Sequence, residues 1–345
     1  MMAEIHVQRS DFAKATAVPR TLVPAPGQAL FRVEQFAITA NNVTYATYGV
    51  GMAYWDFFPA PEGFGIVPVW GFGVVEESRV EGLAPGQRFY GYWPMASHAL
   101  LTPGRISPRG FTDMAPHRQK LAAVYNGYVP ASEAFGAEPV QALFRPLYTT
   151  AFVLDLMLQA SPATLLVLTS ASSKTALGLA QAAKGRMRVV GLTSDANRGF
   201  VEATGYYDVV LGYDEVARLA DGAGQAALVD FSGNGKVRLA VHETLGARLI
   251  ESHIVGDTHW DVANAAALPG VEAKLFFAPS VIADRIGQWG ADGFEARLAA
   301  AWGAFIATLD WLKIVDAKGP EAVIAQWQAM VGGRIDPAVG VVAAV

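Results

Sequence analysis

Short runs of alternating apolar and polar residues, separated by Gly and Pro turns, fill the first 145 residues. Residues 29–36 alternate in the way expected of a strand with one buried face. Residues 67–76 form an apolar run that contains glycine, as a curved or bulged strand does, and residues 83–92 combine a turn with a further strand. Regular turns without helical periodicity predict a small β-barrel-like domain.

The pattern changes after Pro146. Residues 163–168 begin with Ala-Thr and continue as an apolar run, which is typical of a parallel strand covered on both faces. Further strand-like runs begin near Val189, Ala226 and Ala247, with helix-like segments between them. Strands that alternate with helices predict a parallel sheet with right-handed crossovers. The expected fold class is α/β, in which a Rossmann-type, doubly wound parallel sheet follows the β-barrel.

The end of the chain departs from this alternation. From residue 311 onward the pattern reads strand, helix and strand, which does not extend the parallel sheet, so we expect it to return to the first domain. A chain of 345 residues also exceeds the roughly 250–300 residues at which a single core stops growing. We therefore predict one domain of residues 1–148 and 310–345 and a second domain of residues 149–309.

The composition of the chain argues against nucleic acid and membranes as binding partners. The net charge is −5 without a run of Lys or Arg, so no basic face exists to bind nucleic acid. No apolar stretch reaches the roughly 18 residues of a membrane span, and the N-terminus lacks the apolar core of a signal peptide. We expect a cytoplasmic protein with no membrane partner. The absence of cysteine excludes disulfides, thiolate nucleophiles and Cys-ligated metal centres.

Five segments in a characteristic order carry a family resemblance. Residues 31–42 read F-R-V-E-Q-F-A-I-T-A-N-N, 73–76 read G-V-V-E, 85–91 read P-G-Q-R-F-Y-G, 146–151 read P-L-Y-T-T-A and 332–335 read G-G-R-I. This order resembles the medium-chain dehydrogenase/reductase superfamily, specifically its zinc-free quinone oxidoreductase and enoyl reductase branch. An uncharacterised family of unknown function within the superfamily is similar in its S-A-S-S-K-T-A turn. The resemblance implies a GroES-like β-barrel domain for substrate and catalysis.

The metal-binding residues of the zinc-dependent relatives are missing. Those relatives carry a Cys and a Gly-His-Glu near the turn that here reads V-P-V-W-G-F-G, at residues 67–73. The histidines lack the close pairing of a ligand set; they stand at positions 6, 98, 117, 242, 253 and 259. His253 and His259 are near enough in sequence to meet at a cleft edge, but a polar surface role is the simpler interpretation. We predict no metal.

The expected phosphate-binding turn contains no glycine. It reads T-S-A-S-S-K-T-A, residues 169–176, and by resemblance Ser173 to Ala176 stand in place of G-G-V-G. Hydroxyls and an ammonium group bind phosphate oxygens through charge-assisted hydrogen bonds. The candidate phosphate ligands are Ser172, Ser173, Lys174 and Thr175. The alternative is that Ser172 or Ser173 only caps the helix and Lys174 is solvated.

The end of the second strand bears on the choice between NAD and NADP. Asp195 lies about 20 residues after the turn, as the acidic residue of NAD-binding proteins does. By resemblance, Arg198 and Tyr213 embrace a 2′-phosphate, and the hydroxyl of Ser194 suits the same group. We expect NADP (NADPH) as the cofactor. The alternative makes Arg198 a surface residue and packs Tyr213 under the sheet edge.

Three hydroxyls are candidates for the nicotinamide end. Thr150 lies in the segment between the domains, and Ser232 and Ser252 follow or end later strands, outside whose carboxyl ends ligands bind. The alternative is that they serve only loop turns. Residues 273–278 read as an edge strand, which by resemblance would pair with its twin in a homodimer.

Catalysis in the zinc-free branch requires positioning and perhaps a proton from the protein, because the cofactor carries the hydride. The resemblance assigns these roles to Asn41 and Tyr54, whose phenol would stabilise a developing enolate oxygen. Tyr54 stands in an aromatic run, so an apolar wall is the alternative. We expect an NADP-dependent, metal-free oxidoreductase acting on a small molecule such as a quinone, enone or enoyl thioester. The alternative function is a non-catalytic NADP-binding or redox-sensing protein.

Overall fold

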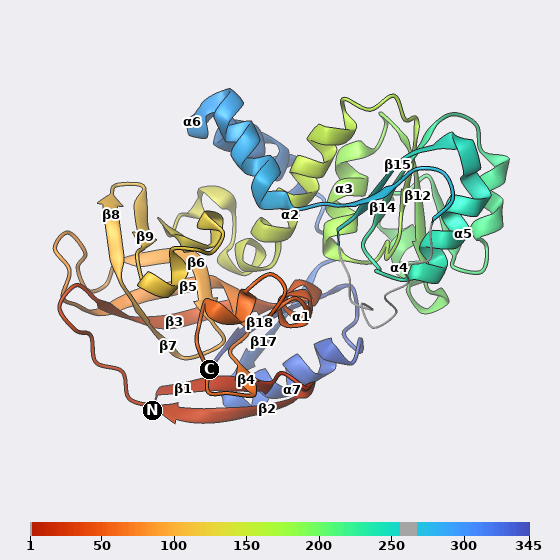
Figure 1. Cartoon of the computed structure of the whole chain (residues 1–345). Helices are drawn as coiled ribbons and strands as arrows, with labels where there is room; N and C mark the ends of the chain where they lie inside the picture. Colours follow the sequence, from red (N-terminus) through yellow and green to blue (C-terminus); the bar gives the residue numbers. More distant parts are fainter. Residues whose placement is uncertain (1, 256–267) are drawn as a thin grey trace. The chain divides into compact units, whose positions relative to one another are not determined.

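The computed structural model describes residues 2–255 and 268–345 and divides into two compact units (Figure 1). Residues 1–146 and 312–345 form the first, here called the barrel unit. Residues 147–311 form the second, here called the Rossmann unit. The predicted fold class is confirmed, because a largely antiparallel β-structure and a parallel six-stranded sheet are both present.

The barrel unit contains a nine-stranded sheet and a three-stranded sheet. In the larger sheet the strand order is β17-β18-β3-β5-β6-β10-β9-β8, with β7 also pairing with β3, and the smaller sheet has the order β2-β1-β4. The strands are β1 (Met2–Gln8), β2 (Asp11–Arg20), β3 (Ala29–Ile38), β4 (Phe64–Gly65), β5 (Pro68–Ser78), β6 (Arg88–Pro94), β7 (His98–Leu101), β8 (Pro103–Ser107), β9 (Gly110–Asp113), β10 (Gly127–Pro130), β17 (Lys313–Lys318) and β18 (Val339–Ala344).

The centre of this sheet bends where β3 meets β5. The register shifts twice between these strands, and such bulges increase twist and curvature. Gly71 is required there, because a Cβ atom would lie 2.1 Å from the carbonyl oxygen of Gln35. The end of the chain joins the same sheet: β18 runs antiparallel to β3 and parallel to β17.

The Rossmann unit is built on a parallel sheet whose strand order is β13-β12-β11-β14-β15-β16. All four residues of β11 are buried, as expected for a strand covered on both faces. The chain reverses its direction of travel across the sheet between β11 and β14, and ligands of open α/β sheets bind at such a switch point. The strands are β11 (Leu165–Leu168), β12 (Arg188–Thr193), β13 (Val209–Gly212), β14 (Ala226–Asp230), β15 (Leu249–Ile254) and β16 (Ala273–Leu275).

The helices complete the two units. Helix α2 contains the division between them and has Pro146 in its interior, and α6 kinks at Gly290, where φ is 71°. Within the described residues, no helix is long and apolar enough to cross a membrane. The helices are α1 (Ala40–Thr47), α2 (Glu138–Leu158), α3 (Lys174–Ala183), α4 (Asp195–Ala203), α5 (Gly235–Leu245), α6 (Ala278–Ile306) and α7 (Pro320–Val331).

Candidate functional site

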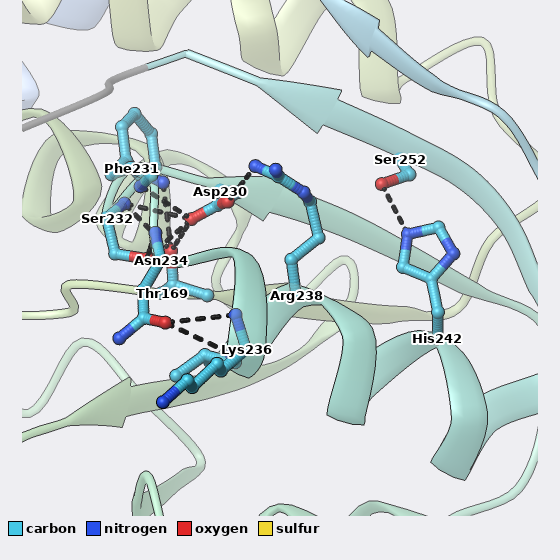
Figure 2. Close-up of polar contacts among 11 residues, drawn as sticks. Thr169, Asp230, Phe231, Ser232, Asn234, Lys236, Arg238, His242 and Ser252 are labelled. Carbon is cyan, nitrogen blue, oxygen red and sulfur yellow. Dashed lines mark hydrogen bonds and ion pairs between the residues drawn. The ribbon is translucent and has the colours of Figure 1, made fainter. Parts of the chain in front are cut away.

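A buried carboxylate, that of Asp230, lies at the switch point of the parallel sheet. Asp230 ends β14, and its Oδ1 accepts a hydrogen bond of 2.6 Å from the hydroxyl of Thr169, which follows β11 (Figure 2). The backbone N–H of Ser232 donates to the same oxygen at 2.9 Å. Arg238 on α5 donates to Oδ2 at 2.9 Å. Asp230 therefore ties the ends of β11 and β14 together, and its charge is paired with a guanidinium group.

Ser232, a predicted nicotinamide contact, belongs to this network. Its hydroxyl donates to Asp230 Oδ1 at 2.8 Å and accepts from the N–H of Asn234 at 3.0 Å. Asn234 in turn caps α5, because its side chain accepts from the N–H groups of Lys236 and Val237. The hydroxyl of Ser232 thus shapes the loop that leads into α5.

Ser252 lies apart from Ser232 and pairs with a histidine (Figure 2). His242 Nδ1 contacts the carbonyl oxygen of Pro269 at 3.1 Å, so this nitrogen carries the proton. In the neutral ring Nε2 is then an acceptor, and the Ser252 hydroxyl donates to it at 2.9 Å. Burial lowers the pKa of His242. This pair joins α5 to β15 inside the protein.

The glycine-free turn has the backbone geometry of a glycine-containing one at Ser170. Ser170 has a φ of 45°, a left-handed conformation that serine rarely adopts. Two tyrosines hold the turn: the Tyr213 hydroxyl accepts from the N–H of Ser170 at 3.2 Å, and the Tyr207 hydroxyl donates to the carbonyl of Ala171 at 2.8 Å. Tyr213, predicted to lie beside the 2′-phosphate, is therefore at the turn itself.

The residues that follow Ser170 lead into helix α3. Ser173 is its N-cap and accepts from the N–H of Ala176 at 3.3 Å. Ser172 accepts a hydrogen bond of 3.0 Å from the amide of Asn197 on α4. Lys174 and Thr175 follow in the first turn and are half-buried. The capping role expected as the alternative is present for Ser173. Ser172, Ser173, Lys174 and Thr175 all stand at this helix N-terminus, and a helix N-terminus favours anions.

Arg198 on α4 is held by acidic residues. Its guanidinium donates to the carboxylate of Glu215 and lies 4.0 Å from that of Asp195. The N–H of Gly212 and the guanidinium groups of Arg218 and Arg198 hold the pKa of Glu215 at about 2. A 2′-phosphate would have to replace Glu215 as the partner of Arg198. Ser194 occupies the N-cap position of α4 and is half-buried.

Thr150, the third candidate for the nicotinamide end, lies in α2 and is half-buried. Among residues 2–255 and 268–345, no group of three or more His, Cys, Asp or Glu side chains is placed to hold a metal ion. His253 contacts Glu251 at 3.1 Å, whereas His259, its suggested partner, lies outside the described residues.

The two predicted catalytic residues lie in the barrel unit and contact different tyrosines. The amide of Asn41 donates to the hydroxyl of Tyr45 at 2.7 Å, and Tyr54 shares a hydrogen bond of 3.1 Å with Tyr125. Burial raises the pKa of Tyr54, so its phenol keeps its proton at neutral pH. Asn41 is therefore connected to Tyr54 through Tyr45, whose ring lies 4.6 Å from that of Tyr54.

Several residues of the candidate site belong to no recognisable sequence motif. Thr169 and Asp230 were recognisable only as residues at strand ends, and Arg238 follows Asp230 by eight positions within a helix. Tyr92 and Tyr125 contribute to the aromatic cluster around Tyr54. Their distance along the chain hides this association, which depends on the tertiary fold.

The family model named "Protein of unknown function (DUF2855)" matches residues 36–336, most of the chain. This chain belongs to the DUF2855 family. Among curated protein sequences, none matches it significantly. The family name carries no activity, so the fold comparison provides the remaining information.

Several solved structures share the whole fold. CurA from Vibrio vulnificus matches with a TM-score of 0.65 and 16% identity, over 100% of this chain and 99% of that one. The yhdH oxidoreductase from Salmonella enterica, in complex with NADP, matches with a TM-score of 0.58 and 15% identity over 100% of both chains. The CurF ER cyclopropanase of the curacin A biosynthetic pathway matches with a TM-score of 0.63 and 14% identity, over 99% of each chain. At these identities the comparison establishes a common fold.

Proposed function

We propose that this DUF2855 protein is an NADP-dependent, metal-free oxidoreductase that transfers hydride from NADPH to a quinone, enone or enoyl thioester. The observation that carries the proposal is the switch point between β11 and β14, which adjoins a turn with a left-handed residue at Ser170 and a helix N-terminus rich in hydroxyls. Such a turn and helix favour a bound pyrophosphate. Fold relatives crystallised with NADPH or NADP support the choice of cofactor.

The donor set of the turn suits a dinucleotide. Ser172, Ser173, Lys174 and Thr175 would hold the pyrophosphate through hydroxyl, ammonium and backbone N–H donors. Arg198, Tyr213 and Ser194 would hold the 2′-phosphate, with Glu215 displaced from Arg198. Thr150 and the loop at Ser232 would adjoin the nicotinamide end, while Ser252 supports β15 through His242.

The bound cofactor supplies the hydride, and the chain supplies position and polarisation. In the barrel unit, Tyr54 retains its proton because burial raises its pKa, so it is a hydrogen-bond donor at neutral pH. A donor placed at a carbonyl oxygen stabilises the negative charge that develops there during hydride transfer. Asn41 would act on the Tyr54 phenol indirectly, since its amide donates to Tyr45.

A homodimer is part of the proposal. Strand β16 lies at the edge of the parallel sheet, and its Leu275 is 64% exposed. An edge strand with unpaired backbone groups and an exposed leucine is able to pair with a second chain. Light scattering on the purified protein tests this, with a dimeric mass expected and a monomeric mass at micromolar concentration contradicting it.

The activity is tested by following NADPH oxidation against a panel of quinones, enones and enoyl thioesters. We expect turnover with at least one class and unchanged activity after dialysis against a chelator. A protein that binds NADPH but oxidises it with none of these compounds would be the second candidate, a non-catalytic NADP-binding or redox-sensing protein. In either candidate, Glu215 has to move before a 2′-phosphate can pair with Arg198.

A further inference from the structure

Four tyrosines bring their hydroxyls together inside the barrel unit. The rings of Tyr45 and Tyr54 lie 4.6 Å apart, and those of Tyr92 and Tyr125 lie 4.7 Å apart. All four side chains are buried, and Tyr92 is completely inaccessible. The hydroxyl of Tyr92 interacts electrostatically with those of the other three. These four residues are called the tyrosine cluster below.

The hydrogen bonds of the cluster leave protons without acceptors. The oxygen of Tyr45 accepts from the amide of Asn41 at 2.7 Å and from the indole N–H of Trp70 at 3.0 Å. Both of its lone pairs are then used. Tyr125 interacts with the hydroxyls of Tyr45 and Tyr54. Three hydroxyl protons thus share two contacts, so at least one of them has no acceptor in the cluster.

Tyr92 adds a second such proton. Its hydroxyl is buried and has no hydrogen-bond partner in the described part of the chain. Buried hydroxyls are almost always hydrogen-bonded in native proteins, because leaving one unpaired is unfavourable. Burial also raises the pKa of Tyr92 and Tyr125, so both remain donors at neutral pH. The cluster therefore contains two hydroxyl protons that have no acceptor within it, one of them on Tyr92.

One buried arginine, Arg118, helps to hold the backbone carbonyl groups of Tyr92 and Tyr125 in place. Arg118, which is 1% exposed, donates to the carbonyl of Tyr125 at 3.1 Å and to the hydroxyl of Tyr128 at 3.0 Å. Tyr128 donates in turn to the carbonyl of Tyr92 at 2.5 Å. The charge of Arg118 also acts on the Tyr92 hydroxyl, but Asp113 already neutralises it, so a further anion in the cluster would have no cation of its own.

We propose that Tyr54, Tyr92 and Tyr125 form a binding site for a neutral carbonyl oxygen. Such an oxygen accepts two hydrogen bonds and brings no proton of its own, which matches the two hydroxyl protons without an acceptor. A carboxylate fits poorly, because an anion buried without a cation is strongly disfavoured. The inference rests on the proposed function, since it makes these tyrosines the donors that hold the carbonyl group of the substrate.

Binding of 2-cyclohexen-1-one, labelled with ¹³C at its carbonyl, tests the site in the intact protein without cofactor. Isotope-edited infrared spectra report the C=O stretch, and titration reports the affinity. Removing one donor is expected to weaken binding roughly 3- to 10-fold. We expect this loss in Tyr92→Phe and Tyr125→Phe, with a shift of the C=O stretch to higher frequency. Cyclohexene, which lacks the oxygen, should bind wild type and both variants equally.

Tyr90→Phe is the matched control. Tyr90 lies on the same strand as Tyr92 and is buried, and its hydroxyl also has no hydrogen-bond partner in the described part of the chain. Its ring contacts Trp70, Phe72 and Arg145. The cluster residue with which it interacts electrostatically is Tyr45, which is not one of the three proposed ligands. Removal of the Tyr90 hydroxyl should leave the C=O frequency unchanged. Tyr92→Phe should also keep or raise the thermal midpoint, because it deletes an unpaired buried hydroxyl.

Two outcomes overturn the proposal: enone binding and frequency that are unchanged in Tyr92→Phe and Tyr125→Phe, or a fall in the thermal midpoint of ligand-free Tyr92→Phe, which would mean that its hydroxyl already has a partner. A parallel NADPH titration separates the two claims. Enone contact without NADPH binding contradicts the proposed function and leaves the carbonyl site standing. NADPH binding without enone contact does the reverse.

Discussion

Ser170 is the residue of the glycine-free turn that has a left-handed backbone conformation. Its φ of 45° is the conformation that glycine adopts without strain. The surrounding hydrogen bonds to Tyr213 and between the Ser173 N–H and the Ser170 carbonyl hold it there. At this position the chain keeps the backbone shape of a phosphate-binding turn while using a residue that would normally avoid it.

Ser170→Gly is expected to keep or increase stability. A non-glycine residue in the left-handed region costs about 1–2 kcal/mol, and glycine costs about 0.5–1 kcal/mol in added chain entropy. Urea unfolding should therefore show a net gain of about 1 kcal/mol or less. Ser172→Gly, at a position without positive φ, should be destabilising. A loss of stability in Ser170→Gly as large as that in Ser172→Gly would contradict the account of the turn.

At the scale of elements, the strands of the Rossmann unit follow directly from the sequence. The continuous apolar run at 163–168 becomes β11, since buried parallel strands need apolar residues on both faces. The tyrosine cluster had no comparable signal, because Tyr54 and Tyr125 are 71 positions apart. Nor did the sequence show that Ser170 would have positive φ, because the conformation is imposed by neighbouring elements.

The contact between α5 and β15 should make stability depend on pH. Burial, opposed by the hydrogen bond to Pro269, lowers the pKa of His242 below its usual 6.5, and Arg238 lowers it further while Asp230 raises it. Below pH 6.5 the unfolded chain therefore binds more protons than the folded chain. Stability should be full above this pH and fall as the pH drops toward the folded pKa.

Unfolding in urea between pH 5 and 7.5 measures this slope. His242→Gln should flatten it, since the titrating ring is gone. Ser252→Ala retains the ring, so it should lower stability at pH 7.5 and keep a slope. An identical slope in wild type and His242→Gln would show that other groups cause the pH dependence.

The ion pair between Arg198 on α4 and Glu215, which follows β13, means that a 2′-phosphate would have to compete with Glu215. Glu215→Gln removes a charge but keeps an oxygen for the N–H of Gly212. We expect NADPH to bind about 2- to 5-fold more tightly to this variant, the range of an exposed ion pair. NADH, which has no 2′-phosphate, should be unaffected, and Asp214→Asn serves as a neighbouring charge control. Weaker NADPH binding in Glu215→Gln would mean that Glu215 supports the site rather than competing with the phosphate.

For the whole molecule, the proposed cofactor site and the proposed carbonyl site lie in different units. The Rossmann unit contains the turn, the switch point and Arg198, and the barrel unit contains the tyrosine cluster. The order of strands, helices and closing tail was accessible from hydrophobic patterns because each unit follows a common architecture. The polar networks of Asp230 and Arg118 were not, since they join residues from several elements.

The central claim is that this chain binds NADPH, with Arg198 as the partner of the 2′-phosphate, and fluorescence titration of the intact protein with NADPH and NADH tests it most directly. Because a charge-assisted contact to the 2′-phosphate adds about 1.5–3 kcal/mol, NADPH should bind about tenfold or more tightly than NADH. Arg198→Glu should abolish that preference. Failure of both nucleotides to bind at millimolar concentration, or an unchanged preference in Arg198→Glu, would contradict the account.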